Sequence, residues 1–385
     1  MKKHISNYFL YFPLLLIIIL SQSACMKLGI NFKRKAPIHE GRYPDFGRKD
    51  SLRGQLTPLR TSYDVKKYVL NLDVDVEEEY IKGSVDIHFK MLDSTDKIQI
   101  DLFENMKINK ILHNNKNLNF EREHDAVFID FSEKIASEKT EIISVFYEGK
   151  PTESKRPPWK SGLVWKKDKD KNKWVGVACE GDGASIWWPL KDHPYDEADS
   201  TNINITVPKG LFCVSNGRLQ ERKVSKNGEK ETFKWLVSYP INTYNVTLYI
   251  GNYEHFSLPY SKNDTIYPLQ FYVLPYNKEK AKKHFEQTED IIRYFETAFG
   301  EYPWWRDEYK MVESPYAGME HQTAIAYGSG YKNRMGYNFD YIILHETAHE
   351  WWGNSISTND HAEMWIHESF TTYMEALFVE DFMSK

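Results

Sequence analysis

Between residues 63 and 253 the sequence consists mainly of short segments in which apolar and polar side chains alternate. Successive side chains of a strand point to opposite faces, so this alternation is typical of half-buried β-strands. Gly, Asn, Asp and Ser separate the segments and favour turns. The pattern predicts an antiparallel, sandwich-like β domain over residues 61–255, with its clearest segments at "YVLNLDVDV", "GSVDIHFKML", "TNINITVP" and "YNVTLYIGNY".

A different periodicity begins after residue 255. Residues 277–300 carry apolar side chains at steps of three and four and end at a glycine, as an amphipathic helix does. The segment "YKMVES" predicts a strand, and two more helices are predicted after the glycine-rich stretch "YAGMEHQTAIAYGSG". We therefore expect a multidomain chain of β plus α/β type, in which residues 256–385 form the second domain.

Composition restricts the partners and the metal ligands of the chain. The 385 residues carry a formal net charge of −5, which gives no reason to expect a nucleic-acid partner. Three cysteines, Cys25, Cys179 and Cys213, are too few for a disulfide framework and lack the CxxC spacing of a metal site. Any metal is therefore expected to be held by histidine and carboxylate.

Residues 1–25 are predicted to be a signal peptide. Two lysines precede an apolar run of 13 residues, which is too short to span a bilayer comfortably. The following "SQSAC" resembles a bacterial lipoprotein processing site, with Cys25 lipidated, although Gln22 replaces the usual aliphatic residue. We expect export to the bacterial cell envelope, with a lipid anchor in the membrane; periplasmic release after ordinary cleavage and an uncleaved anchor are the alternatives. Residues 26–60 are interpreted as a lead-in segment or tether.

The residues His345, Glu346 and His349 form the sequence His-Glu-x-x-His. Residues four apart lie on one face of a helix, so both imidazoles can turn toward one ion. Glu346 can reach a water molecule beside that ion, which suits a general base. A catalytic zinc takes three protein ligands from nitrogen and oxygen. The motif therefore predicts one Zn²⁺ per chain, and a surface helix that contains these residues by chance is the alternative.

A third ligand is needed, and Glu368 is the best candidate. It follows the second histidine after 18 intervening residues, which allows a loop and a second helix that points back at the pair. Glu363 and Glu375 are the competitors. Glu363 lies near the loop, whereas Glu375, two helical turns further on, suits an acceptor that orients a ligating histidine. His361 and His367 are interpreted as loop or helix-surface histidines.

The spacing of these ligands, together with "WWGN" and "ESF" beside them, resembles the M1 family of zinc aminopeptidases, the gluzincins related to aminopeptidase N and leukotriene A4 hydrolase. The stretch "YAGMEHQT" resembles the Gly-x-Met-Glu-Asn motif of the family, with His321 where Asn is usual. The stretch "CEGDGASIWWPLKDHPYDEADS" resembles another family segment, with Glu180 where Gln is usual. The resemblance covers about residues 60–385 and implies a thermolysin-like metallopeptidase domain.

The resemblance implies removal of N-terminal residues from peptides, with zinc as the cofactor. Glu320 would bind the free α-ammonium of the substrate and Glu180 would assist, since a buried carboxylate near zinc needs a cation as partner. Gly318 and Met319 are expected to contact the substrate, because glycine allows close approach of a backbone. The alternatives are a fragment that binds zinc and peptide N-termini without turnover, and a zinc endopeptidase.

The family resemblance also implies a tyrosine that donates to the oxyanion and a helical domain, both beyond the third ligand. The sequence ends at Lys385, 17 residues after Glu368, so no position of this sequence matches either feature. Tyr327, Tyr331 and Tyr373 are substitutes in principle, although packing explains them more simply. Loss of one oxyanion donor lowers the rate by about 100- to 1,000-fold. The last predicted helix would leave an apolar face uncovered, so we expect an incomplete catalytic domain.

Overall fold

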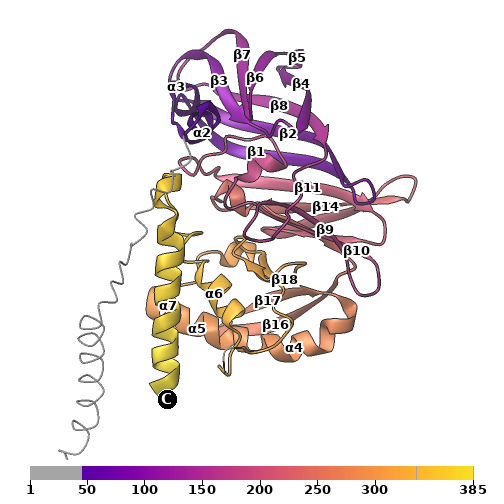
Figure 1. The fold of residues 1–385 in the computed structure, drawn as a ribbon, viewed down its shortest axis with the longest axis vertical. Coiled ribbons are helices and arrows are strands. Elements are labelled where there is room, and N and C mark those ends of the chain that lie inside the picture. Colours follow the sequence, from indigo (N-terminus) through magenta and orange to yellow (C-terminus); the bar gives the residue numbers. More distant parts are fainter. Residues whose placement is uncertain (1–45, 335, 385) are drawn as a thin grey trace, which may run out of the picture. The chain divides into compact units, whose positions relative to one another are not determined.

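The computed structural model describes residues 46–334 and 336–384, and the part from Arg48 onward forms one compact unit (Figure 1). The predicted signal peptide, Cys25 and most of the lead-in segment lie outside the described residues. Within the described ranges, no helix has both the length and the apolar character needed to cross a membrane.

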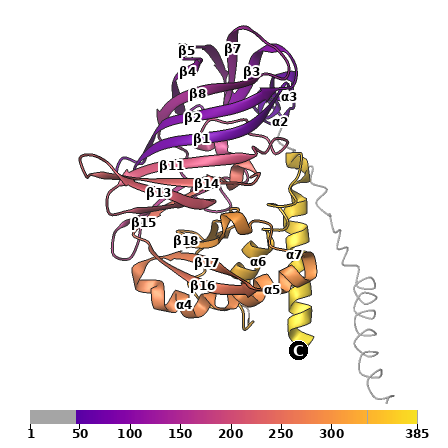
Figure 2. The same ribbon diagram turned by 180° about the vertical axis from the view of Figure 1, so that it is seen from behind.

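The first half of the compact unit is built on an eight-stranded sheet (Figures 1 and 2). Leu70 lies opposite Val85 in an antiparallel pair and beside Ile203 in a parallel one, and all three are buried. This parallel pair departs from the antiparallel expectation; a long connection between its two strands permits it. The strand order is β13 (Arg218–Val224), β14 (Lys230–Val237), β11 (Ser200–Pro208), β1 (Tyr63–Asp75), β2 (Tyr80–Met91), β8 (Thr140–Gly149), β4 (Met106–His113) and β5 (Lys116–Asn117).

Two smaller sheets complete the β domain, and the buried faces of all three contribute to one core. Alternate residues of the strands face this core, as the periodicity predicted. Trp187 and Trp188 fill its centre from a segment without regular strand structure, in T-shaped contact with each other. The strand order of one sheet is β3 (Thr95–Asp101), β7 (Ala126–Ile135) and β6 (Asn119–Glu123). The strand order of the other is β12 (Phe212–Ser215), β15 (Leu248–Gly251), β10 (Lys173–Ala178) and β9 (Gly162–Lys167).

The structure corrects the expected extent of the lead-in segment. Residues 48–61 form two short helices, α2 (Arg48–Gly54) and α3 (Pro58–Thr61). Arg60 is fully buried, and its guanidinium donates to Asp101 Oδ1 at 2.6 Å. A buried ion pair needs well-fixed partners, so this segment is part of the fold. Residues 48–60 of the expected lead-in segment are therefore folded and packed against the β domain, whose boundary at residue 61 stays a prediction.

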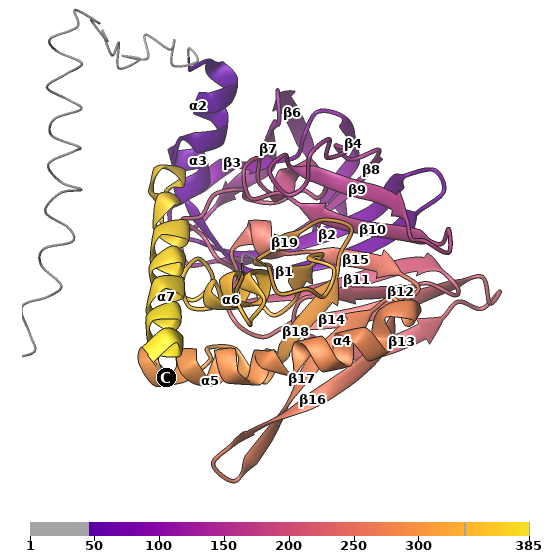
Figure 3. The ribbon, with the colours of Figure 1, turned by 60° about the horizontal axis from the view of Figure 1, so that its bottom comes forward.

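The second half of the unit contains a mixed five-stranded sheet and four helices (Figure 3). Helix α6 packs against α5, α7 and the strands β19 and β20, which places it between a sheet and a helix. The order of strands is β16 (Glu254–Lys262), β17 (Thr265–Val273), β18 (Tyr309–Glu313), β20 (Ile325–Tyr327) and β19 (Gly318–Met319). The helices are α4 (Lys278–Phe285), α5 (Gln287–Phe299), α6 (Tyr341–Ala348) and α7 (Trp365–Ser384).

The amphipathic stretch that we expected to form one helix over residues 277–300 consists of two helices, α4 and α5. The Gln287 side chain donates to the His284 carbonyl at 2.6 Å, and Glu286 separates the two elements. Gly300, with a φ of 98°, ends α5 as predicted, because glycine tolerates a positive φ. Strand β18 and helix α7 agree with the predictions for their segments.

Candidate metal centre

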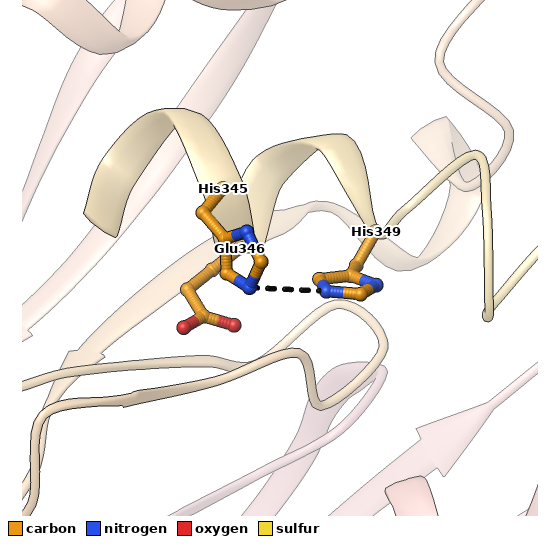
Figure 4. Close-up of side chains that lie close together, drawn as sticks. All are labelled: His345, Glu346 and His349. Carbon is orange, nitrogen blue, oxygen red and sulfur yellow. Dashed lines mark hydrogen bonds between the residues drawn. The ribbon is translucent and has the colours of Figure 1, made fainter. Parts of the chain in front are cut away.

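The two histidines of the metal motif lie at the C-terminal end of α6, with their rings directed toward one another (Figure 4). At the other end of the helix, Asp340 Oδ1 accepts from the Ile342 amide at 2.9 Å and so caps the first turn. The Nε2 atoms of His345 and His349 are 3.3 Å apart. Together with Glu346 they form a group whose potential ligand atoms lie within 4.8 Å of one another.

Each of the two imidazoles is held in place through its Nδ1 atom. His345 Nδ1 lies 2.5 Å from Glu375 Oε1, which belongs to α7. His349 Nδ1 lies 3.0 Å from the Trp352 carbonyl and 3.2 Å from Thr371 Oγ1. A carboxylate or carbonyl at Nδ1 favours the tautomer in which the Nε2 lone pair is free for a metal. Both rings therefore present Nε2 to the same point.

The side chain of Glu368 reaches the same point from α7. One carboxylate oxygen lies 3.5 Å from His349 Nε2 and the other lies 3.7 Å from His345 Nε2. Tetrahedral zinc with bonds of about 2.0–2.1 Å requires ligand atoms about 3.3–3.4 Å apart, so this donor set fits the ion closely. The contact with His349 lowers the pKa of Glu368 to about 2, so the carboxylate is ionised and available as a metal ligand.

Glu346 is buried beside these ligands, and burial raises its pKa well above the ordinary value of a glutamate. The strand that carries Gly318 lies directly against it. A Cβ atom added to Gly318 would lie 2.2 Å from Glu346 Oε1. Close packing against the Glu346 carboxylate therefore favours glycine at this position, and the expected contact of Gly318 with the substrate stays a prediction.

Two further carboxylates lie close to the histidine pair. Glu320 is buried, and its Oε1 accepts from the Tyr244 hydroxyl at 3.0 Å. Glu180 lies in the loop after β10, and repulsion from Glu320 is the main cause that raises its pKa to about 8. Among the described residues, neither carboxylate forms an ion pair with a lysine or arginine. The loop therefore brings Glu180 close to Glu320 without a lysine or arginine beside the two carboxylates in the described part of the chain.

The other residues that we singled out are mostly buried. Met319 packs in the core cluster of the β domain. His321 is fully buried, contacts the Tyr249 hydroxyl at 2.6 Å and has its pKa lowered to about 3 by burial, so it is neutral. His367 is also fully buried and stacks on Tyr244, which corrects its interpretation as a surface histidine. Glu363 lies in the short helix before α7, and no ion pair joins it to His345 or His349 among the described residues.

Comparison with known protein families gives two matches that follow one another along the chain. Residues 61–245 match the Peptidase M1 N-terminal domain, and residues 283–385 match the Peptidase family M1 domain. The chain belongs to the M1 family of zinc aminopeptidases. The prediction of a β domain followed by an M1 catalytic domain is thereby confirmed.

Relatives of this M1 chain include the leucyl aminopeptidase of Saccharolobus solfataricus, 24% identical over 325 residues, which are 80% of this chain and 38% of that protein. The tricorn protease-interacting factor F2 of Thermoplasma acidophilum is 22% identical over 330 residues, 83% of this chain and 39% of the relative. The chain thus spans about two fifths of the length of these relatives.

Solved structures support the fold of the M1 chain. The M1 zinc metallopeptidase of Deinococcus radiodurans superposes with a TM-score of 0.70 at 22% identity, covering 85% of this chain and 72% of that protein. A mutant of that protein, bound to the substrate Tyr-Ser-Ala, superposes with a TM-score of 0.69 at 21% identity, covering 83% and 71% of the two chains.

Sequence reasoning missed several residues of this M1 site. Tyr244, Asn354 and Thr371 all contact predicted site residues, yet none of them stands in a ligand-type pattern. Asn354 belongs to "WWGN", which carried the resemblance, so its position beside the motif was the available signal. Tyr244 had no such signal, because its neighbour Glu320 lies 76 positions away.

Proposed function

We propose that this chain binds one zinc ion through His345, His349 and Glu368 and removes N-terminal residues from peptides. When bound, zinc activates a water molecule and polarises the carbonyl that is attacked. Glu346 accepts the proton of that water and passes it to the leaving amine. Its buried position supports this role, because burial raises the pKa of the carboxyl and so makes the carboxylate a stronger base than an exposed glutamate.

The observation that carries the exopeptidase part of the proposal is the pair of neighbouring acids, the buried Glu320 and the half-buried Glu180, which form no ion pair with a lysine or arginine among the described residues. Glu320 and Glu180 repel each other, and this arrangement becomes favourable when a positive group enters between them. A peptide with a free N-terminus supplies an α-ammonium of the required charge. An endopeptidase has no use for this pair, because internal peptide bonds carry no such group.

Hydrolysis of alanine 4-nitroanilide tests the proposal, with release of the nitroaniline followed by its absorbance. We expect turnover that a chelator abolishes and that added zinc restores. Glu346→Gln should remove turnover while the protein still binds zinc. Glu133→Gln, which changes an exposed glutamate on β7, is the matched control and should keep full activity. Absence of metal-dependent turnover in the unsubstituted chain contradicts the proposal.

An N-acetylated peptide separates the aminopeptidase from the zinc endopeptidase. Blocking the N-terminus should abolish cleavage if Glu320 binds the α-ammonium, and Glu320→Gln should raise KM for free peptides by about tenfold or more. Cleavage of the acetylated peptide at the rate of the free one would establish the endopeptidase instead.

Binding of zinc and peptide without turnover is the second candidate function. It is favoured by the positions of the three tyrosines that we considered as substitutes for the oxyanion donor. The Tyr327 hydroxyl donates to Asp340 Oδ2 at 2.6 Å and is thus engaged away from the metal ligands. Tyr331 is buried in the core, and Tyr373 is largely exposed on α7. Zinc-dependent binding of a peptide without nitroaniline release would identify this function.

We further propose that the protein is exported and carries a lipid on Cys25, on the basis of the sequence pattern alone. Cells that produce the protein can be supplied with an alkyne-tagged fatty acid, which labels lipidated proteins. The chain should acquire the label, and Cys25→Ser should abolish it. Equal labelling of the two proteins excludes this anchor.

A further inference from the structure

A short turn of the β domain, η2 (Thr243–Asn245), holds Glu320 of the catalytic domain at two points. The Tyr244 hydroxyl donates to Glu320 Oε1 at 3.0 Å. The neighbouring Asn245 acts on the backbone of the same residue through Asn354: Asn245 Nδ2 donates to Asn354 Oδ1 at 2.7 Å, and Asn354 Nδ2 donates to the Glu320 carbonyl at 2.9 Å. Both the side chain and the backbone of Glu320 are therefore fixed by one turn.

The same tyrosine is also tied to the segment that carries the second acid. The Cys179 thiol, next to Glu180 in sequence, donates to the Tyr244 carbonyl at 3.2 Å. Both Glu180 and Glu320 act electrostatically on the Tyr244 hydroxyl. Tyr244 therefore connects the segments of the two carboxylates from which the proposed ammonium pocket is built.

The Tyr244 hydroxyl is suited to act as a lasting donor. The side chain is buried, and burial, followed by the charges of Glu320 and Glu180, raises the pKa of the phenol well above its ordinary value. Among the residues that the structure describes, no other side chain donates a hydrogen bond to the Glu320 carboxylate. The phenol thus engages Oε1, and within residues 46–334 and 336–384 no side chain donates to Oε2.

We propose that Tyr244 is a positioning residue, whose hydroxyl fixes the Glu320 carboxylate so that its second oxygen is left to bind the α-ammonium of the substrate. This inference rests on the function proposed above. Without the donor, the buried carboxylate has to rotate or recruit water to satisfy Oε1, and its alignment with the substrate is lost. Tyr244→Phe should therefore weaken binding of the charged group specifically.

Two amides of equal shape make this specificity measurable. L-Leucinamide carries an α-ammonium, and 4-methylpentanamide is the same molecule without the amine. We define the ammonium preference as the ratio of their dissociation constants, measured by calorimetry on the zinc-loaded chain. Tyr244→Phe should reduce the preference by about tenfold, which is typical for a hydrogen bond to a charged group, and leave binding of the uncharged amide unchanged.

A matched control and a second variant keep the test decisive. Tyr147→Phe removes another buried phenol of the β domain, one that donates to the Trp187 carbonyl at 3.0 Å, and should leave the preference unchanged. Combined with Glu320→Gln, Tyr244→Phe should have no further effect. If Tyr244→Phe does not fold, Glu320→Asp withdraws the carboxylate from the phenol and should produce the same loss.

The possible outcomes separate this inference from the proposed function. Two results overturn the positioning role and leave the ammonium pocket intact. In the first, Tyr244→Phe weakens the binding of both amides equally. In the second, Tyr244→Phe leaves the ammonium preference unchanged although Glu320→Gln abolishes it. An unsubstituted chain without any preference overturns both the pocket and the role of Tyr244. A normal preference without nitroanilide hydrolysis refutes only the turnover part of the proposed function.

Discussion

Replacing Glu180 by glutamine should stabilise the zinc-free protein while it weakens the binding of substrate. The pKa of Glu180 is raised from an ordinary value of 4.5 to about 8, mainly by repulsion from Glu320 and then by burial. Each pKa unit corresponds to about 1.4 kcal/mol, so the ionised side chain destabilises the fold by at most about 5 kcal/mol. Because a buried glutamine also needs hydrogen-bond partners, we expect a gain of about 2 kcal/mol.

The sign of the pH dependence follows from linkage. Below pH 4.5 the carboxyl is protonated in both the folded and the unfolded chain and contributes nothing. Between pH 4.5 and about 8 the unfolded chain releases the proton while the folded chain retains it, so stability falls as the pH rises. Above pH 8 the full destabilisation is present. The glutamine variant lacks this contribution, and its advantage should therefore grow between pH 5 and pH 9.

Urea unfolding of the zinc-free proteins at pH 5, 7 and 9 measures this advantage as a difference in the free energy of unfolding. Glu133→Gln, which changes an exposed side chain, provides the baseline for loss of one negative charge. A Glu180→Gln variant that is no more stable than the baseline at pH 9, or whose advantage does not change with pH, would refute the reasoning. The same variant should bind L-leucinamide more weakly, which illustrates how function can oppose stability at a binding site.

Three further predictions concern other parts of the site and the fold. Gly318→Ala places a Cβ 2.2 Å from the carboxylate behind it, so kcat for the nitroanilide should fall on the order of 100-fold with zinc content unchanged. Glu375→Gln weakens the contact that orients His345 at 2.5 Å, and zinc affinity in a chelator competition should fall by about 10- to 100-fold. Arg60→Ala leaves Asp101 buried without its partner; urea unfolding should show a loss of about 3–5 kcal/mol, and recovery on adding Asp101→Ala would support this cause.

The predictable part of the fold was the part encoded locally. Alternation of side chains identified several strands of the β domain, among them β1, β2, β11 and β15, and glycine at position 300 marked the end of α5. The break at Glu286 was not predicted, because it depends on a contact between Gln287 and the His284 carbonyl rather than on periodicity. The helices α2 and α3 were missed for a similar reason, since burial of Arg60 depends on Asp101 from a distant strand.

The site shows the same division between local and distant information. The spacing of His345 and His349 on a helix, and of Glu368 on the next, is enough to predict that the three side chains converge. The place of Tyr244 could not be predicted in this way, because no regular spacing relates a turn of one domain to a carboxylate of another. His367 was misjudged since helical periodicity says which residues share a face but not which neighbour covers that face.

Because η2 belongs to the β domain and Glu320 to the catalytic domain, the proposed binding of amino groups would depend on how closely the two domains are packed together. A slight separation, too small to alter circular dichroism, lengthens the hydrogen bond from Tyr244 before either half melts. As the denaturant concentration rises, the Michaelis constant should therefore increase before circular dichroism changes. Its increase would report on the packing between the two domains.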